Sequence, residues 1–335
     1  MRIAVDAMGG DHAPARPVDG ALAAARHLGL GIDLVGRAAE IHAELQRHAD
    51  AGDLDVRVID APDVIGMAES PAQALRRKPK ASIRVAAEHV AAGEAAALFS
   101  AGHTGATVVA AHAAFGMLRG VDRPALAPTV PTRLGFAVLL DAGATIECKP
   151  IHLRQFGAMG AVYARVGLGV ERPRVGLLSI GEEETKGNEL TREAHQLLKA
   201  SALDFVGNVE ARGIFAGEAD VVVCDGFTGN VALKLSEGLV EMVEDLLGEE
   251  LHSTFSAQMG YLLSRRAFRR FRKRVDYSEF GGAPLLGVAG LCIVGHGRSS
   301  VKAVRNAVAM AARMAGGQMM ERLTQEMSSA AVSKS

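Results

Sequence analysis

Short apolar runs with β character alternate with alanine-rich segments of helical spacing along most of this chain. Residues 2–7 precede a helical segment at 15–28, and residues 96–100 precede one at 104–118. The strand-like runs, such as 221–224, are solidly apolar, which is typical of strands covered on both faces. The alternation predicts a three-layer α/β/α unit with one mostly parallel sheet and helices on both of its faces.

At 335 residues the chain can form one α/β catalytic unit over 1–335, undivided or in two lobes. We expect a helical, basic protrusion around 235–278. The other expected strands lie at 32–35, 56–59, 125–130, 136–141, 175–180, 205–209, 220–224 and 291–294. One further expected helix follows the strand at 32–35 and ends at His48. The remaining expected helices span 82–92, 151–166, 189–201, 230–247 and 299–327.

The composition excludes several classes of protein. A net charge of −1 argues against broad coating of nucleic acid, and three cysteines without a CxxC pair argue against a disulfide framework or zinc knuckle. The chain meets Asp6 without a long apolar run, so no signal peptide is expected. Residues 95–118 are uncharged but are broken by polar residues at 100–105, which predicts a strand, a turn and a helix rather than a membrane span.

Glycine and polar residues crowd the carboxyl ends of the predicted strands, where ligands bind in a doubly wound sheet. They occupy residues 6–12, 100–105, 181–188, 225–230 and 295–300. Three of these turns place small and hydroxyl residues before a helix, where free N–H groups favour an anion, although such residues also serve as ordinary helix caps. No Walker A loop or GxGxxG fingerprint is present, so a nucleotide is not favoured.

Several side chains at these ends could carry chemistry. Lys186, flanked by acids and a glycine, could reach a phosphate or an oxyanion, or belong to a solvated charged loop. Asp6, Asp11 and His12 could position a substrate or form a turn, and no metal-ligand spacing supports a metal site. Cys224 ends a strand and is expected to be a buried, inert thiol rather than a nucleophile.

Seven segments, in order, resemble the acyl-ACP:phosphate acyltransferase (PlsX) family of bacterial phospholipid synthesis. They are DAMGGD at 6–11, SAGHTGA at 100–106, ECKP at 147–150, GEEETKG at 181–187, GNVE at 207–210, CDGFTGN at 224–230 and GGAPLLGV at 281–288. The resemblance runs from Met1 to about Gly317. The chain departs from the family pattern at His103, Thr145 and Ser179, which stand where asparagine is expected.

The resemblance implies that orthophosphate attacks the acyl thioester of acyl carrier protein, giving acyl phosphate and free carrier protein. It also implies a fold akin to phosphotransacetylase and the isocitrate-dehydrogenase group, and a cytoplasmic homodimer peripherally associated with the inner face of the cell membrane. No organic cofactor and no metal are implied. Phosphate is already nucleophilic at pH 7, so the enzyme must mainly supply proximity and stabilise the tetrahedral oxyanion.

Site residues follow from these turns and from the resemblance. The expected phosphate-binding residues are Asp6, Gly9, Gly10, Asp11, Ser100, Gly102, His103, Thr104, Gly105, Thr228 and Gly229. Lys186 and Asn230 are expected to donate hydrogen bonds to the phosphate or the thioester oxygen. His12, His296 or a water would protonate the departing thiolate.

The near-zero net charge hides two opposed blocks. Residues 241–250 hold five acids and no base, and residues 265–274 hold seven bases and no acid. With its aromatic residues the basic block consists of Arg265, Arg266, Phe268, Arg269, Arg270, Phe271, Arg272, Lys273 and Arg274. A basic helix of this kind predicts binding to an anionic membrane surface or to acyl carrier protein, or a solvated face, whereas nucleic acid would need a broader basic surface.

Two other classes of function stay open. An isocitrate-dehydrogenase-like, NAD(P)-dependent oxidoreductase would need a nicotinamide site and metal-binding aspartates, and neither is evident in the sequence. A non-catalytic membrane scaffold would use only the basic helix, and its glycine-rich turns would be dispensable.

Overall fold

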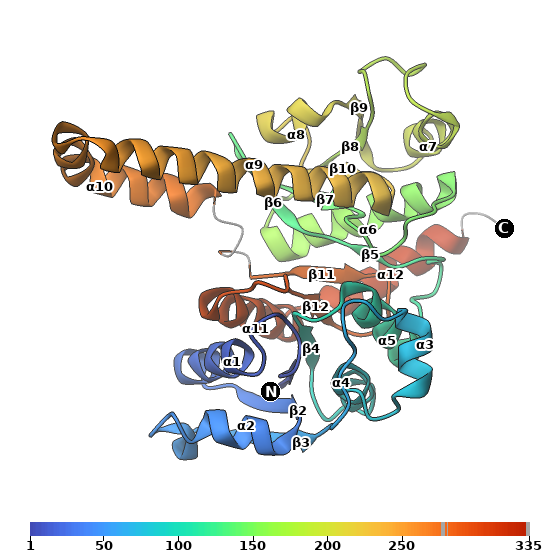
Figure 1. The fold of residues 1–335 in the computed structure, drawn as a ribbon. Helices are drawn as coiled ribbons and strands as arrows, with labels where there is room; N and C mark the ends of the chain where they lie inside the picture. Colours follow the sequence, from blue (N-terminus) through green and yellow to red (C-terminus); the bar gives the residue numbers. More distant parts are fainter. Residues whose placement is uncertain (276–278, 280, 333–335) are drawn as a thin grey trace.

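The structure, a computed structural model, describes residues 1–275, 279 and 281–332 (Figure 1). Its strands are β1 (Arg2–Asp6), β2 (Gly31–Gly36), β3 (Val56–Asp60), β4 (Ala97–Ser100), β5 (Ala125–Leu126), β6 (Thr129–Thr132), β7 (Gly135–Leu140), β8 (Arg174–Leu178), β9 (Asp204–Val209), β10 (Val221–Val223), β11 (Ala283–Leu286) and β12 (Cys292–Val294). Its α-helices are α1 (Ala15–Leu28), α2 (Ala38–Leu45), α3 (Pro71–Arg77), α4 (Ser82–Ala91), α5 (Thr104–Phe115), α6 (Pro150–Leu168), α7 (Glu189–Lys199), α8 (Ala211–Ala216), α9 (Gly226–Ser253), α10 (Phe255–Val275), α11 (Val301–Gly316) and α12 (Met319–Val332).

The strands form two sheets, so the expectation of a single sheet is wrong. One sheet has the order β3-β2-β1-β4-β12-β11-β5, and the other has the order β6-β7-β10-β8-β9. Both are mostly parallel, and the three-layer α/β class is confirmed. The chain crosses between the sheets inside the segment 125–130, which was expected to be one strand, because Pro128 has no N–H to continue a ladder.

Glycine and aspartate account for two further differences from the expected elements. The helix expected at 299–327 is divided into α11 and α12, because Gly317 leaves the helical region with φ −92° and ψ 176°. Helix α9 begins at Gly226 instead of residue 230, because Asp225 caps it by accepting the N–H of Thr228. The short elements β11, α3 and α8 were not expected.

Alternating side chains bury both faces of the larger sheet. Ile3 and Val5 of β1 pack with α1 and α11, whereas Ala4 packs with α4 and α5 on the other face. All three are fully buried. Full burial of a side chain such as Ile or Val is worth roughly 1.5–3 kcal/mol, so this strand fixes the helices on both faces.

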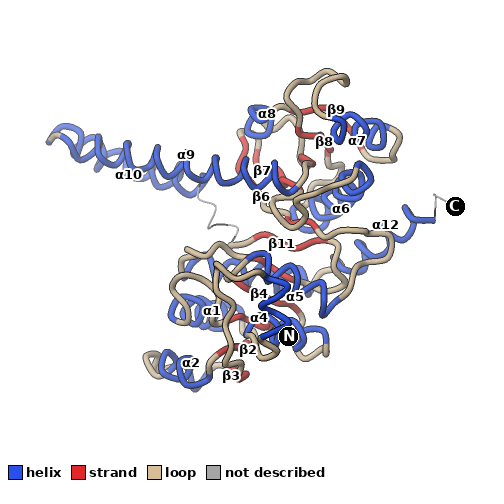
Figure 2. The backbone as a smooth tube through the Cα atoms, turned by 45° about the vertical axis from the view of Figure 1, so that its right-hand side comes forward, coloured by secondary structure: helices blue, strands red, loops and turns tan. Residues whose placement is uncertain are grey.

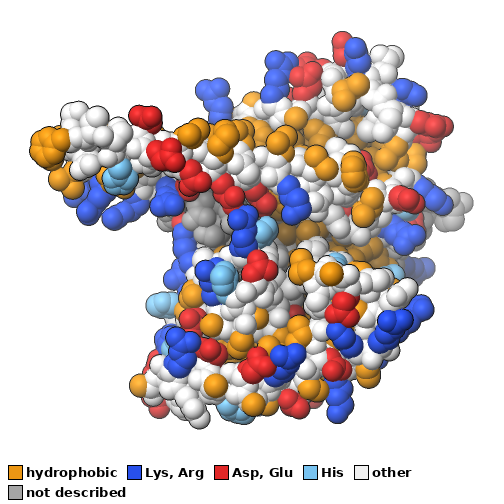
Figure 3. All heavy atoms as spheres, in the orientation of Figure 1, with side chains coloured by type: hydrophobic (Ala, Val, Ile, Leu, Met, Phe, Trp, Pro, Cys, Tyr) orange, Lys and Arg blue, Asp and Glu red, His pale blue; other side chains and the backbone are white. Residues whose placement is uncertain are grey.

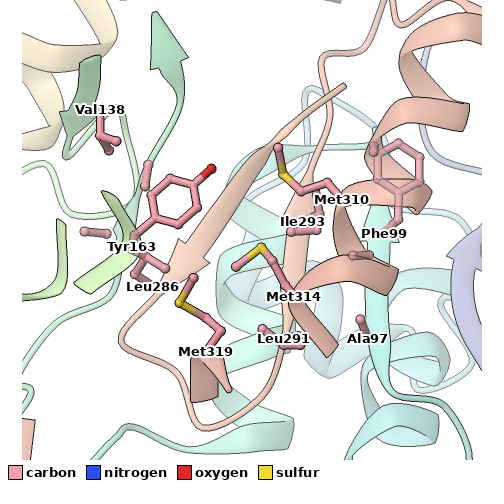
Figure 4. Close-up of a cluster of buried hydrophobic side chains, with 14 of the residues drawn as sticks. Ala97, Phe99, Val138, Tyr163, Leu286, Leu291, Ile293, Met310, Met314 and Met319 are labelled. Atoms are coloured by element: carbon pink, nitrogen blue, oxygen red, sulfur yellow. The ribbon is translucent and has the colours of Figure 1, made fainter. Parts of the chain in front are cut away.

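One hydrophobic cluster continues from the larger sheet into the smaller one (Figure 4). Phe99 and Ile293 belong to the larger sheet, and Val138 belongs to the smaller sheet. Tyr163 of α6 and Met314 of α11 lie in the same cluster between them. The two sheets therefore share a core, in which flexible methionine side chains fill irregular gaps.

Helices α9 and α10 form an antiparallel hairpin that projects beyond both sheets (Figure 2). Arg272 of α10 pairs with Glu244 of α9 at 3.3 Å. Residues 276–278, the end of the expected protrusion, and the side chains of Lys273 and Arg274 fall outside the description. Among the described residues, no helix combines the length and the apolar character needed to cross a membrane. The uncharged stretch at 95–118 instead forms β4 and α5, as predicted.

Buried Asp141 ties the two sheets together at the carboxyl end of β7. Its carboxylate accepts the N–H of Leu126 in β5 at 2.7 Å, a contact to the larger sheet. It also accepts the N–H groups of Gly143, Ala144 and Thr145, which follow β7, at 3.0, 3.0 and 2.6 Å. Burial raises the pKa of Asp141 to about 6, and the four backbone hydrogen bonds oppose this rise.

Asp141→Ala is expected to lower the free energy of unfolding by about 3 kcal/mol or more, because each buried N–H left without an acceptor costs roughly 1–3 kcal/mol. Urea unfolding followed by circular dichroism measures the change. The matched control Asp245→Ala, at an exposed position of α9, should stay within about 0.5 kcal/mol of the parent chain. An Asp141→Ala variant as stable as the parent would show that this carboxylate does not join the sheets.

Candidate active site

A cavity of about 190 Å³ opens at the carboxyl ends of β1 and β4. The structure brings seven of the expected phosphate-binding residues to its wall: Asp6, Gly9, Gly10, Asp11, Ser100, Gly102 and His103. Ser82 and residues 64–67 complete much of the lining, and sequence reasoning missed them because no glycine-rich motif marks that loop. Thr104 and Gly105 lie in the first turn of α5, directly after His103.

Glycines let three loops approach one another at this cavity. A Cβ added at Gly9 would lie 2.7 Å from the nitrogen of Gly102 and 2.9 Å from Oδ2 of Asp6. Gly10 has a φ of +107°, and the next residue, Asp11, donates its N–H to the carbonyl of Gly297 at 2.8 Å. The loops after β1, β4 and β12 therefore meet backbone to backbone.

Asp6 anchors the floor of the cavity. Its carboxylate accepts the hydroxyl of Ser100 at 2.7 Å and the N–H of Met8 at 3.2 Å. Ser100 Oγ in turn accepts the N–H of Gly102 at 3.1 Å. Burial raises the pKa of Asp6, and the hydrogen bonds from Ser100, Ser82 and Met8 oppose the rise. A side chain held this way orients the 100–102 turn.

The start of α5 is an open helix end at this site. In helices α7, α9 and α11, one N–H group of the first turn donates to a side-chain cap. The caps are Asn188, Asp225 and Ser300. His103, at the corresponding position of α5, makes no such cap. Within the described part of the chain, the first three N–H groups of α5, at residues 104–106, have no acceptor. Free N–H groups at the positive end of a helix dipole bind anions.

The imidazole of His103 faces the same place. Its Nδ1 atom is buried and has no hydrogen-bond partner among the described residues, and the ring lies next to Gly105. A buried polar atom without a partner is costly unless a ligand satisfies it. His103, which replaces the expected asparagine, therefore places a buried polar atom without a partner among the described residues at the cavity wall.

The second half of the expected site lies on the smaller sheet. Asn230 donates from Nδ2 to the carbonyl of Ala142 at 3.1 Å and lies against Gly143, which has a φ of +132°. Thr228 and Gly229 lie inside the first turn of α9, so the expectation of a turn over residues 225–230 is wrong. The N–H and the hydroxyl of Thr228 are both bonded to the cap of α9, so this end of α9 is less open to an anion than the start of α5.

Lys186 is exposed on the acidic loop after β8 and makes no ion pair within the described residues. Two buried side chains fix this loop. Asn208 donates to the carbonyl of Glu183 at 2.8 Å, and His195 is hydrogen-bonded to Asn208 at 2.9 Å. The carbonyl of Glu183 also accepts the N–H of Lys186 at 3.0 Å. The GNVE motif signalled Asn208 in the sequence, but the role of His195 was missed.

Helix α9 links the two halves of the site. His296 lies 3.9 Å from Glu237 of α9, and Arg298 pairs with Glu241 one turn further along at 3.1 Å. Asn230 precedes Glu237 by seven residues, or about 10 Å along a helix. Helix α9 therefore contacts the carboxyl-end loops of both sheets, at positions about 10 Å apart along its axis. His12 is exposed in the loop after β1.

The cysteines do not form a nucleophilic centre. Cys224 is buried at the end of β10, and burial raises its pKa well above the ordinary value. Burial likewise raises the pKa of Cys148 to about 12. Both thiols stay protonated at neutral pH, so Cys224 fits the inert role expected of it.

The fold places the chain in a known structural class. It is similar to a phosphotransacetylase from Streptococcus pyogenes, with a TM-score of 0.64 at 17% identity over 94% of both chains. A 4-hydroxythreonine-4-phosphate dehydrogenase from Klebsiella pneumoniae gives 0.53 at 15% identity, over 94% of this chain and 99% of that one. These likenesses show the fold alone.

Sequence comparison is more specific. The model of the fatty acid synthesis protein family matches residues 1–322. A phosphate acyltransferase from Geobacter sp. (strain M21) is 52% identical over 97% of this chain and 93% of its own, and one from Geobacter sulfurreducens is 51% identical over 98% and 94%. The chain belongs to this family, and the family assignment and the acyltransferase class made from the sequence motifs are confirmed.

Gly9→Ala is expected to reduce acyl phosphate formation by about 100-fold, because displacing the 100–102 turn by even an ångström disorders the site. The rate is measured with saturating thioester while phosphate is varied. Gly52→Ala is the control, since its added Cβ meets nothing within 4 Å. Equal rates for the two variants would contradict a tight backbone contact in the working site.

Proposed function

We propose that this protein transfers an acyl group from acyl carrier protein to orthophosphate, as a step of phospholipid synthesis. A phosphate oxygen attacks the thioester carbonyl, the C–O bond forms and the C–S bond breaks. The pantetheine thiolate leaves and takes up a proton. The observation that carries the proposal is the uncapped start of α5, which follows His103 and includes Ala106, both at the wall of the Asp6 cavity.

Phosphate fits this cavity because its oxygens accept the N–H groups at the start of α5 and a hydrogen bond from His103. Lys186 and Asn230 reach from the smaller sheet and donate to the phosphate or to the developing oxyanion. Donors of this kind stabilise a tetrahedral intermediate without a strong general base. His12, His296 or a water supplies the proton to the leaving thiolate.

The deciding experiment incubates the protein with acyl carrier protein thioester and phosphate. Free carrier protein and acyl phosphate should appear together and only when phosphate is present. Release without phosphate dependence would reject the proposal. A change in NAD(P)H absorbance with a hydroxy-acid substrate would favour the oxidoreductase class instead.

Lys186→Ala should lower the rate of acyl phosphate formation by roughly 100–1000-fold, the usual loss when an oxyanion donor is removed. Lys234→Ala, an exposed lysine on α9, serves as the control and should keep the parent rate. Near-full activity of Lys186→Ala would remove Lys186 from the catalytic residues while leaving the phosphate site intact.

The hairpin supports a further part of the proposal, a homodimer bound peripherally to the cytoplasmic face of an anionic membrane. Exposed apolar residues at helical spacing form a stripe along α9 (Figure 3): Leu235, Leu239, Met242 and Leu246. A second copy of the chain would cover this stripe. Nearer the tip, Phe255 and Leu263 are 80% and 84% exposed, close to the basic residues of α10, as in membrane-surface helices.

Replacing Arg265, Arg269 and Arg270 by Glu should weaken co-sedimentation with anionic vesicles at least tenfold, since each basic residue near such a surface contributes about 1 kcal/mol. Arg272 is retained because it pairs with Glu244 inside the hairpin. Neutral vesicles provide the comparison. If this variant bound anionic vesicles as well as the parent chain does, the proposed membrane role of α10 would be wrong.

A further inference from the structure

A second basic surface, separate from the hairpin, lies on α3 and the segment that follows it. Arg76, Arg77 and Lys80 are exposed, and within the described part of the chain none of them makes an ion pair. Figure 3 shows Lys and Arg side chains gathered over this part of the molecule, at the lower right. We define Arg76, Arg77 and Lys80 as the α3 basic surface.

The acidic residues around this surface are already engaged. Glu69 pairs with Lys78 at 2.6 Å and also accepts the N–H of Gly66 at 2.7 Å. Glu88 pairs with Arg84 at 2.8 Å on α4. The α3 basic surface therefore keeps its positive charge.

This surface borders the proposed phosphate site. Pro71, the first residue of α3, lies against the start of α5, where a Cβ added to Gly105 would be 3.0 Å from the Pro71 ring. Arg77 ends α3 six residues later, or about 9 Å along a helix. The positive charges of α3 thus lie roughly one short helix away from the free N–H groups of α5.

An exposed apolar side chain lies at the wall of the cavity. Met67 is 66% exposed, and the loop 64–67 forms part of the cavity wall. An exposed methionine beside unpaired cations suits a partner that brings an acidic face and an apolar arm.

The basic residues of α10 before Arg272 lie toward the tip of the projecting hairpin. Arg272 itself lies opposite Glu244, three residues beyond Glu241, which pairs with Arg298 of the loop after β12. Arg265 and Arg269 precede Arg272 in α10 and lie still further out, because the hairpin is antiparallel.

We infer that the α3 basic surface docks the acidic carrier protein and directs its thioester over Met67 into the Asp6 cavity. The inference rests on the proposed function and deepens it by assigning the carrier protein to α3 and not to α10. The proposed role of helix α10 is then to bind the membrane.

The test compares Arg76→Glu/Arg77→Glu/Lys80→Glu with the hairpin variant that carries Glu at 265, 269 and 270. Each is assayed with two thioesters of the same acyl chain, one on acyl carrier protein and one on free pantetheine. The α3 variant should raise KM for the carrier-protein substrate roughly tenfold or more, because loss of complementary charge slows association. Its rate with acyl-pantetheine should be unchanged, which also shows that it folds.

The hairpin variant should keep the parent KM for the carrier-protein substrate. An α3 variant with parent KM for that substrate would overturn the docking assignment, and so would equal losses with both thioesters. An α3 variant that instead loses binding to anionic vesicles, with KM unchanged, would assign the surface to lipid. If the parent chain forms no acyl phosphate from either thioester, the proposed function itself fails.

Discussion

The whole arrangement depends on one buried carboxylate, that of Asp141. It accepts N–H groups from β5 in one sheet and from the turn after β7 in the other. Gly226, at the start of α9, has no room for a side chain against Asp141 and Thr145, so α9 begins directly on this joint. Since α9 also supplies Asn230 and meets the loop after β12, the geometry of both half-sites follows from how this carboxylate is satisfied.

The joint explains why the chemistry is divided between two sheets. The larger sheet holds an open helix end and a cavity, and in the proposed mechanism the smaller sheet supplies Lys186 and Asn230 as donors. On α9, Asn230 lies about 10 Å along the helix from Glu237, which contacts His296. A phosphate held on one side can then meet a thioester carbonyl polarised from the other, which is the proximity that this reaction needs.

The sequence was sufficient to predict the α/β fold class and many of the residues that line the cavity. Gly9, Gly10 and Gly102 followed from glycine-rich strand ends, because close backbone approach requires glycine there. It was insufficient for the division into two sheets, since Pro128 interrupts an otherwise continuous β-like run. The sequence also did not distinguish the uncapped α5 from the capped α9. Thr228 is a plausible anion ligand from the sequence, but in the structure its N–H and hydroxyl both donate to Asp225.

The net charge of the chain likewise does not reveal where its charged surfaces lie. A net charge of −1 is compatible with two separated basic surfaces, because charges on a surface act over about a Debye length, roughly 8–10 Å, and not through the total. Helix α3 begins against the first turn of α5 at the cavity, whereas Arg265 and Arg269 of α10 lie toward the tip of the projecting hairpin. A partner that must deliver a reacting group is steered only by charge near the reacting atoms, and a membrane needs only charge on a projecting element. On the proposed assignment, α3 serves the carrier protein and the outer part of α10 serves the membrane.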